Sequence, residues 1–159
     1  MLLRYIYTFF LAVILVTFVG VGIAAFYKGP KQPEYPLGLS YPGVPLEKST
    51  ESAQVRSEQF KYDKGQRNFQ HANEIYSKNV STIAVAGALL ILILSITLLS
   101  KIYFISDGLL LGGVFTLIYA IIRGFGAGDE MFRFIVVSIG LAVAIFLGYW
   151  RFVGNNKLK

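Results

Sequence analysis

Residues 80–99 read VSTIAVAGALLILILSITLL and residues 103–122 read YFISDGLLLGGVFTLIYAII, with Ser100 and Lys101 as the only polar residues between them. Both runs are apolar on every side of a helix, whereas a surface helix of a soluble protein keeps one polar face. Because a helix rises about 1.5 Å per residue, about 20 residues cross the ~30 Å hydrocarbon core of a bilayer. The two runs therefore predict two transmembrane helices joined by a tight turn.

Two further apolar runs, residues 2–26 and 131–153, are equally long. A cleaved signal peptide is the alternative for the first run, because Gly22 to Ala24 offers a small-x-small cleavage site. A retained anchor is favoured, because the apolar region of a signal peptide has only about 7–15 residues. The prediction is an all-α integral membrane protein, with four spans in a single membrane domain covering residues 1–159.

The amino-acid composition excludes several classes of functional site. The chain has 55% hydrophobic residues, a formal charge of +6 and no cysteine. The absence of cysteine excludes disulfides, thiolate metal sites and cysteine nucleophiles. Lys and Arg flank the apolar runs, where they suit anionic lipid headgroups, so the positive charge predicts the lipid bilayer as a partner and no nucleic acid.

Residues 28–79 form the long polar segment, which is expected outside the membrane between the first and second spans. All five prolines fall in residues 28–46, and proline disfavours helix, so this part is predicted to be an extended loop. Residues 47–78 lack proline and predict a helix that runs on into the second span, with Gly65 as its weakest point.

Four apolar residues recur every seven positions along that helix: Val55, Tyr62, Phe69 and Tyr76. Seven residues are close to two helical turns, so the four side chains share one face and form a possible interaction face. Something should cover this face. The candidates are the Pro-rich segment, through Tyr35, Leu37, Leu39 and Tyr41, the membrane surface, or another protein.

Gly108, Gly112 and Gly113 form a small-xxx-small pattern in the third span. Glycine allows helix backbones to approach closely, so these residues predict helix packing. The pattern fits packing within one chain, which we favour, or a homo-oligomer. Ala84, Ala86, Gly87 and Ala88 offer a similar surface on the second span, so the two spans are expected to pack together.

Three polar features of the sequence could have a functional role. Asp107 is expected to cap the start of the third helix, with a buried ion site as the alternative. The Gly-rich residues 124–130 between Arg123 and Arg133 lack the lysine of a phosphate loop, so a flexible loop with local ion pairs is expected, and a lipid headgroup site is the alternative. His71 is the only histidine and is expected to be solvated, so no metal site is predicted.

Charges in the short connections predict orientation. With four spans, one side carries the five residues Arg4, Lys101, Arg151, Lys157 and Lys159, and the other short loop carries Arg123 and Arg133. This pattern favours the plasma membrane with both termini in the cytoplasm. The long segment complicates the count, because it holds eight basic and six acidic residues.

The stretch ISDGLLLGGVFTLIY at residues 105–119, followed by IIRGF at residues 121–125, resembles a small uncharacterised family of bacterial four-span proteins. In that family a Pro- and Tyr-rich segment and a charged helix separate the first span from the other three, so the resemblance covers most of the length. It implies the fold only. No activity is known for the family, and therefore no functional residue is carried over.

These features predict a membrane-embedded structural or accessory protein that presents an extramembrane helix to a partner. No catalytic or cofactor-binding residues are predicted, so an enzyme is not expected. A small transporter or channel subunit is the alternative. It would need polar groups around a shared cavity. The candidates in the spans are Ser95, Thr97, Thr116, Tyr119 and Ser138, which their own helix backbones can satisfy.

Overall fold

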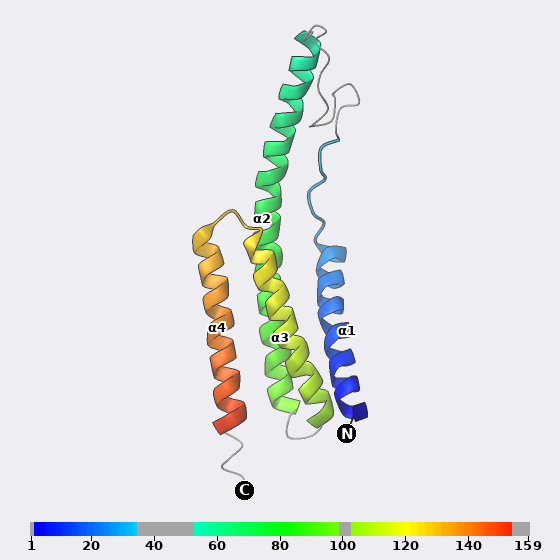
Figure 1. Cartoon of the computed structure of the whole chain (residues 1–159), viewed down its shortest axis with the longest axis vertical. Coiled ribbons are helices and arrows are strands. Elements are labelled where there is room, and N and C mark those ends of the chain that lie inside the picture. The colour runs from blue at the N-terminus through cyan, green and yellow to red at the C-terminus, as the bar shows by residue number, and fades with distance from the viewer. Residues whose placement is uncertain (1, 35–52, 99–102, 154–159) are drawn as a thin grey trace.

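The computed structural model describes residues 2–34, 53–98 and 103–153. The fold is all-helical, with four helices: α1 (Leu2–Phe26), α2 (Ala53–Leu98), α3 (Tyr103–Phe125) and α4 (Glu130–Val153) (Figure 1). Each helix contains a stretch long and apolar enough to cross a membrane. The prediction of four such helices is therefore confirmed.

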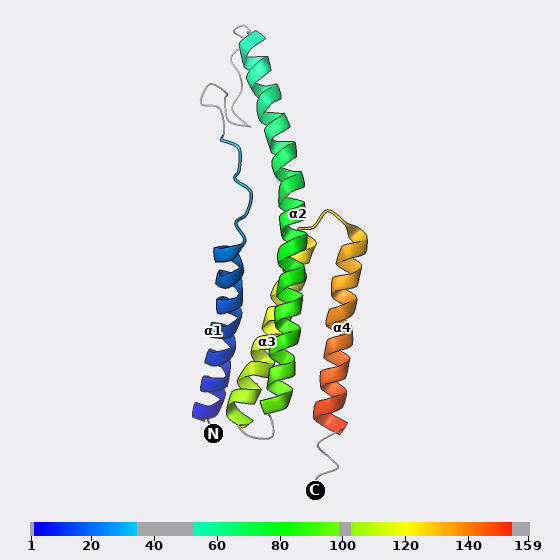
Figure 2. The ribbon, with the colours of Figure 1, turned by 180° about the vertical axis from the view of Figure 1, so that it is seen from behind.

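The helices run alternately up and down in an elongated bundle. The start of α1, the end of α2, the start of α3 and the end of α4 lie at one end, called here the terminal end (Figures 1 and 2). At the opposite end α2 continues well beyond the other helices, and this end is called the projecting end. Residues 27–34 leave α1 and run beside the projecting part of α2 in both views.

Helix α2 has 46 residues and so is about 69 Å long at ~1.5 Å per residue. The polar helix runs into the second span as expected, because the residues from Ala53 onward and the second span belong to this one helix. The expected long extramembrane loop is not borne out. No proline interrupts α2, and the cost of Gly65 is only ~1 kcal/mol. The expected helix start at residue 47 and most of the Pro-rich part fall among residues 35–52, outside the described residues.

Helix α3 is the centre of the bundle, because it contacts each of the other three helices. The glycines of α3 serve two different interfaces. A methyl group added at Gly108 or Gly112 would collide with Leu11 or Leu15 of α1, whereas one at Gly113 would lie 2.7 Å from Leu92 Cδ2 of α2. The small-residue pattern of α3 is thus shared between two neighbours within the chain.

Serine side chains join α2 to α3. Ser95 Oγ donates to the Ser106 carbonyl at 2.8 Å, and Ser106 Oγ donates to the Ser95 carbonyl at 2.7 Å. Nearer the projecting end, Ser81 Oγ donates to the Ala120 carbonyl at 2.8 Å. Ser95 therefore bonds across the interface and not to its own helix as expected. The three serines are buried, so these bonds also satisfy polar groups removed from water.

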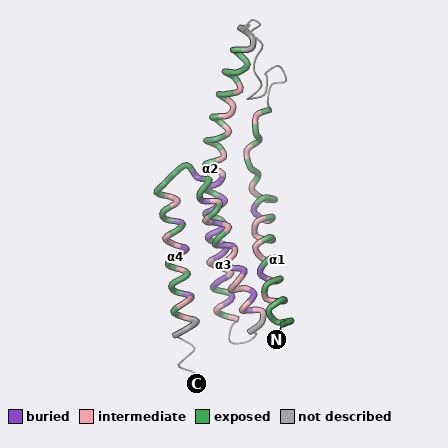
Figure 3. The backbone as a smooth tube through the Cα atoms, viewed as in Figure 1, coloured by how far each residue is buried: buried purple, intermediate pink, exposed green. Residues whose placement is uncertain are grey.

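The buried residues concentrate where α2 and α3 meet, and the outer faces of α1 and α4 are exposed (Figure 3). Those outer faces are strongly apolar; exposed residues on them include Phe9, Phe10, Phe18, Val21, Phe134, Ile135, Leu141, Ile145 and Phe146. A water-facing surface rarely carries apolar patches of this extent. This surface composition suits a lipid environment.

Candidate interaction surfaces of α2 and the polar cluster at the projecting end

The predicted interaction face of α2 lies toward residues 27–34 of the same chain. Tyr62, Phe69 and Tyr76 are half-buried, and the side chain of Val55 lies outside the described ones. A Cβ at Gly65 would lie 3.4 Å from Pro33 Cβ, and a Cβ at Gly29 would lie 3.3 Å from Tyr76 Cζ. The cover near Gly65 and Tyr76 is thus the start of the Pro-rich segment. The proposed contacts from Tyr35, Leu37, Leu39 and Tyr41 fall outside the described residues.

Tyr76 is the residue through which α2 is joined to the end of α1. Its ring stacks on the Tyr27 ring, with centroids 5.3 Å apart and an interplanar angle of 1°. Its hydroxyl donates to the Tyr27 carbonyl at 3.3 Å, and Asn79 Nδ2 donates to the Tyr27 hydroxyl at 2.7 Å. Two residues of α2, one turn apart, therefore hold Tyr27 in place.

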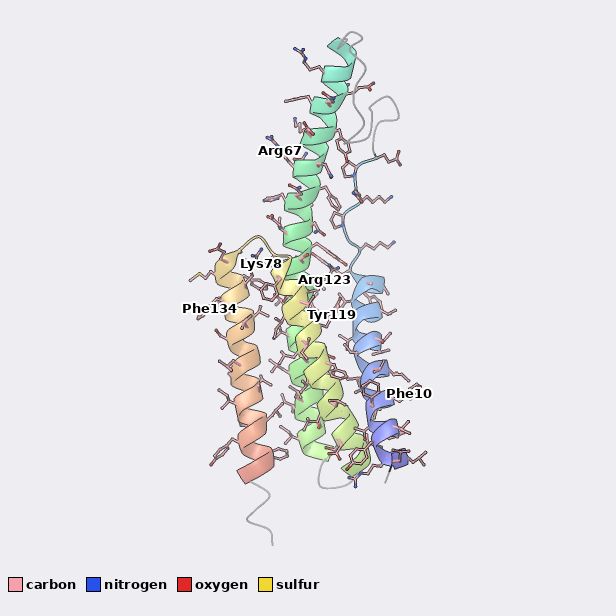
Figure 4. The ribbon with its side chains drawn as sticks, viewed as in Figure 1. Phe10, Arg67, Lys78, Tyr119, Arg123 and Phe134 are labelled. Carbon is pink, nitrogen blue, oxygen red and sulfur yellow. The ribbon has the colours of Figure 1, made fainter. Side chains whose placement is uncertain are left out.

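Arg123, in the last turn of α3, completes this group. Its guanidinium lies over the Tyr76 ring, 5.2 Å from the centroid. Tyr27, Tyr76, Asn79 and Arg123 are called here the junction cluster, because they bring together the end of α1, the middle of α2 and the end of α3. Figure 4 shows Arg123 at the level where α3 ends and α2 continues alone. The side-chain periodicity of the separate helices does not reveal this grouping.

The loop between α3 and α4 is packed closely against α2. A Cβ at Gly124 would lie 3.0 Å from Ser81 Oγ, and one at Gly126 would lie 2.9 Å from Ser77 Oγ. A Cβ at Gly128 would meet the Glu74 carboxylate. The glycines are thus explained by close contact, and the expected ion pairs within the loop are not found among the described residues. The ion pair is made across to α2 instead.

Asp129 makes that ion pair and also caps α4. Its Oδ2 lies 3.0 Å from Lys78 Nζ, and its Oδ1 accepts from the backbone N–H groups of Met131 and Phe132. A carboxylate accepting from the second and third residues of a helix is an N-cap. The hydrogen bond from Lys78, followed by the bond from the Phe132 backbone, lowers the pKa of Asp129 below its ordinary value of 3.8.

Arg133 serves the same loop. Its Nε donates to the Ala127 carbonyl at 2.9 Å, and Lys78 Nζ also lies 5.2 Å from the centre of the Phe132 ring. Of the two arginines that flank the Gly-rich stretch, Arg133 therefore holds the loop, whereas Arg123 faces the junction cluster.

The opposite face of projecting α2 is exposed. Phe60, Lys64, Arg67, His71 and Ile75 recur at spacings of three and four residues, so they share one face, and all five are exposed. Figure 4 shows Arg67 on the side of α2 away from residues 27–34. Phe60 is 71% exposed. This set, called here the outer face of α2, was not singled out from the sequence; the alternation of basic and apolar residues at helical spacing was the available signal.

Asp107 lies at the terminal end and does not cap α3. Helix α3 begins at Tyr103, one turn earlier, and Asp107 Oδ2 lies 3.3 Å from Arg4 Nη2 of α1. The expected cap is therefore wrong, because the helix extends past it and a cation from another helix is within reach. The Arg4 and Asp107 side chains are 44% and 23% exposed, which places the pair at the edge of the bundle.

Two other polar residues of the spans bond within their own helices. Thr97 Oγ1 donates to the Ile93 carbonyl and Thr116 Oγ1 to the Gly112 carbonyl, each within its own helix. Among residues 2–34, 53–98 and 103–153, no three His, Cys, Asp or Glu residues gather as metal ligands. His71 is exposed on the outer face of α2.

No protein family model, curated protein or solved structure matches the chain. The class defined by the fold is accordingly that of a four-helix chain whose helices can each span a membrane.

Proposed function

We propose that this chain is a multi-pass membrane protein with a structural or accessory role, which holds the projecting part of α2 outside the bilayer and presents its outer face to a protein partner. The observation that carries the proposal is the length of α2. The part of α2 from Tyr76, which contacts Arg123, to Ser95, which bonds to Ser106, lies beside α3. The part before it continues as one rod beyond the other helices (Figure 1).

The apolar outer faces of α1 and α4 support placement in the bilayer. Exposed aromatic and branched residues on both helices would be unfavourable in water, where ~25 cal/mol is lost for each Å² of apolar surface left exposed. In hydrocarbon the same residues are well solvated. The plasma membrane, with both termini in the cytoplasm and the projecting end outside, agrees with the five against two basic residues of the short connections.

The exposed side of α2 is the better candidate for partner binding. Tyr62, Phe69 and Tyr76 lie on the side of residues 27–34, so a partner would have to displace the chain's own segment to reach them. The outer face needs no such displacement. Lys64 and Arg67, placed between Phe60 and Ile75, match an acidic protein segment with apolar residues at helical spacing.

A structural role agrees better with the spans than transport does. Ser95, Ser106 and Ser81 are used to bond α2 to α3, and Thr97 and Thr116 bond to their own helices. A transporter would need these groups for its cargo. We therefore propose neither a transport nor an enzymatic activity.

Site-specific photo-crosslinking in intact membranes tests this function. A photoreactive residue at Arg67 on the outer face should form an adduct with a second protein. The matched control is the same residue at Gln66, one position along but half-buried on the inner side, which should crosslink within the chain and leave its mass unchanged. Adducts from both positions, or from neither, would contradict the proposal, and an adduct of twice the chain's mass would identify a homo-oligomer instead.

A further inference from the structure

Arg123 has hydrogen-bond donors without acceptors. Its guanidinium carries five N–H groups and lies over the face of the Tyr76 ring, 5.2 Å from the centroid, and within the described part of the chain it makes no hydrogen bond or ion pair. Arg133 differs, because its Nε donates to the Ala127 carbonyl. Arg123 is also half-buried, so its position is fixed more firmly than that of a surface arginine.

Other donors of the junction cluster lie on the residues that hold Tyr76 and the end of α1 together. The Tyr27 hydroxyl accepts from Asn79 Nδ2 at 2.7 Å, and in the described residues its own hydrogen has no acceptor. The second N–H of the Asn79 amide is in the same situation. The nearby carboxylates are turned elsewhere, because Asp129 pairs with Lys78 and Glu74 lies against Gly128 of the loop. The junction cluster therefore has a surplus of donors and positive charge.

The rings beneath Arg123 are fixed before any ligand arrives. Tyr76 is held by its stack on Tyr27 and by its bond to the Tyr27 carbonyl at 3.3 Å. Lys28 follows Tyr27 directly and adds a second cation to this part of the chain. A group fixed in this way loses little conformational entropy on binding an anion.

The position of the junction cluster along the apolar stretch of α3 indicates which kind of anion it would meet. Arg123 lies in the last turn of α3, at the end of the apolar stretch Ile105–Phe125. In a bundle that spans a bilayer, this level is the edge of the hydrocarbon core, about 15 Å from the membrane centre, directly beneath the lipid headgroups. The inference rests on the bilayer placement in the proposed function, but not on the protein partner.

We propose that the junction cluster is a phosphate-binding site for an anionic phospholipid headgroup, with the Arg123 guanidinium, held against the Tyr76 ring, as the ligand. The planar guanidinium can hold two oxygens of a phosphodiester at once, which an ammonium group cannot do. A bound lipid of this kind would tie α1 to α2 and α3 at the point where α2 leaves the bundle.

The test uses the full chain in lipid nanodiscs that contain phosphatidylglycerol and phosphatidylcholine, followed by release into detergent and native mass spectrometry. We expect phosphatidylglycerol to stay bound and phosphatidylcholine to be lost. Arg123→Gln should reduce the bound phosphatidylglycerol by about tenfold or more, as for loss of a charge-assisted hydrogen-bonded pair. Arg67→Gln is the matched control, since it removes the same charge from the exposed outer face and should leave retention unchanged.

Equal losses from the two variants would mean general attraction by charge and would overturn the site. So would equal retention of the two lipids by the unmodified chain. If Arg123→Gln fails to fold, Arg123→Lys replaces it, because lysine keeps the charge but loses the two-point contact and should still lower retention. Addition of inorganic phosphate separates the two sources: displacement of lipid at millimolar phosphate would assign the site to the free anion, and no displacement supports the lipid.

Failure of this inference is distinguishable from failure of the proposed function. A chain that does not enter nanodiscs at all contradicts the bilayer placement itself. A chain that enters them, forms the Arg67 crosslink and shows no lipid preference loses only the headgroup site.

Discussion

The rings of Tyr27 and Tyr76 lie parallel, 5.3 Å apart between centroids, although 49 residues separate them in the chain. Tyr27 is the first residue after α1, and Tyr76 lies just before the second span within α2. The pair therefore anchors the start of the polar segment to the helix that projects beyond the bundle. Arg123 contacts the same Tyr76 ring, so loss of this one side chain affects three parts of the fold.

Tyr76→Ala should lower the free energy of unfolding by about 2 kcal/mol. It removes a half-buried aromatic ring, the stacking contact of that ring with Tyr27, and the hydrogen bond to the Tyr27 carbonyl. The measurement is the unfolding midpoint of the purified chain in mild detergent. Tyr149→Ala is the control, because Tyr149 is 67% exposed on α4 and its loss should change the midpoint little. Equal midpoints for the two variants would show that the stack does not contribute to stability.

Gly112→Leu should destabilise the contact between α1 and α3 by about 1–3 kcal/mol, because the added side chain has no room. A Cβ there already lies 2.8 Å from Leu15 Cδ2 and 3.3 Å from the Ala12 backbone. Gly22→Leu is the matched control on α1, where a Cβ meets nothing within 4 Å. Thermal unfolding of both variants in detergent checks this, and an unaltered Gly112→Leu would refute the packing described for α3.

Ser95→Ala and Ser106→Ala should each destabilise the contact between α2 and α3, by about 0.6–2 kcal/mol, since interhelical hydrogen bonds in membrane proteins fall in this range. Each hydroxyl donates to the backbone carbonyl of the other residue, which alanine keeps, so the two losses should be close to additive. Thr82→Val is the control, because Thr82 Oγ1 donates to the Lys78 carbonyl of its own helix. Single variants that unfold like the Thr82→Val control would contradict a contribution of these bonds.

Asp129 should make stability depend on pH in acid. Its pKa is lowered in the folded chain, chiefly by Lys78, so the unfolded chain binds a proton first as pH falls. The stabilisation is therefore complete well above the ordinary pKa of 3.8 and is lost as pH falls through the lower folded pKa.

The change that isolates this charge is Asp129→Asn, because asparagine caps a helix about as well as aspartate. Unfolding midpoints measured from pH 6 to pH 2 should differ between the parent and this variant at the upper end and converge at the lower end. Glu130→Gln, a charge change at the exposed neighbouring residue, should give a smaller difference. A difference that grows as pH falls would reverse the sign and exclude the assigned cause.

Cysteine accessibility tests the orientation. A cysteine at Ser57, in the projecting part of α2, should react with an impermeant reagent in intact cells, whereas one at Asn155, beyond α4 and outside the described residues, should react only after permeabilisation. Both substitutions add the only thiol of the chain, so each serves as the control for the other. The reverse pattern would place the termini outside.

The seven-residue spacing of Tyr62, Phe69 and Tyr76 identified a half-buried face of α2 from sequence, but not what covers it. Spacing along one helix is a local property, since it follows from 3.6 residues per turn. The covering segment depends on where the chain goes after α1, and residues 27–34 were brought there by contacts such as Tyr27 with Tyr76. For the same reason the outer face, which no part of the described chain covers, could not be selected in advance.

Asp107 and Asp129 illustrate the same limit for polar groups. Asp107 lies in the first turns of α3, and Asp129 directly precedes α4. The preference of aspartate for the N-cap position favoured Asp107 as the cap of the third helix. In the structure the cap is Asp129, and Asp107 pairs with Arg4 of α1. Capping depends on which residue the helix begins after, and that boundary depends on neighbours distant in sequence.

The sequence by itself determined that the chain forms four helices long and apolar enough to span a membrane, because an apolar run of about 20 residues satisfies all its backbone hydrogen bonds within itself. The sequence also predicted that the polar helix and the second span are continuous, since no proline interrupts residues 53–98. Only the tertiary structure decided that Gly108 and Gly112 face α1 while Gly113 faces α2, and that Arg123 lies over Tyr76 and not in an ion pair with its own loop. Those choices depend on the rotation and depth of each helix against its neighbours, which packing between distant segments sets.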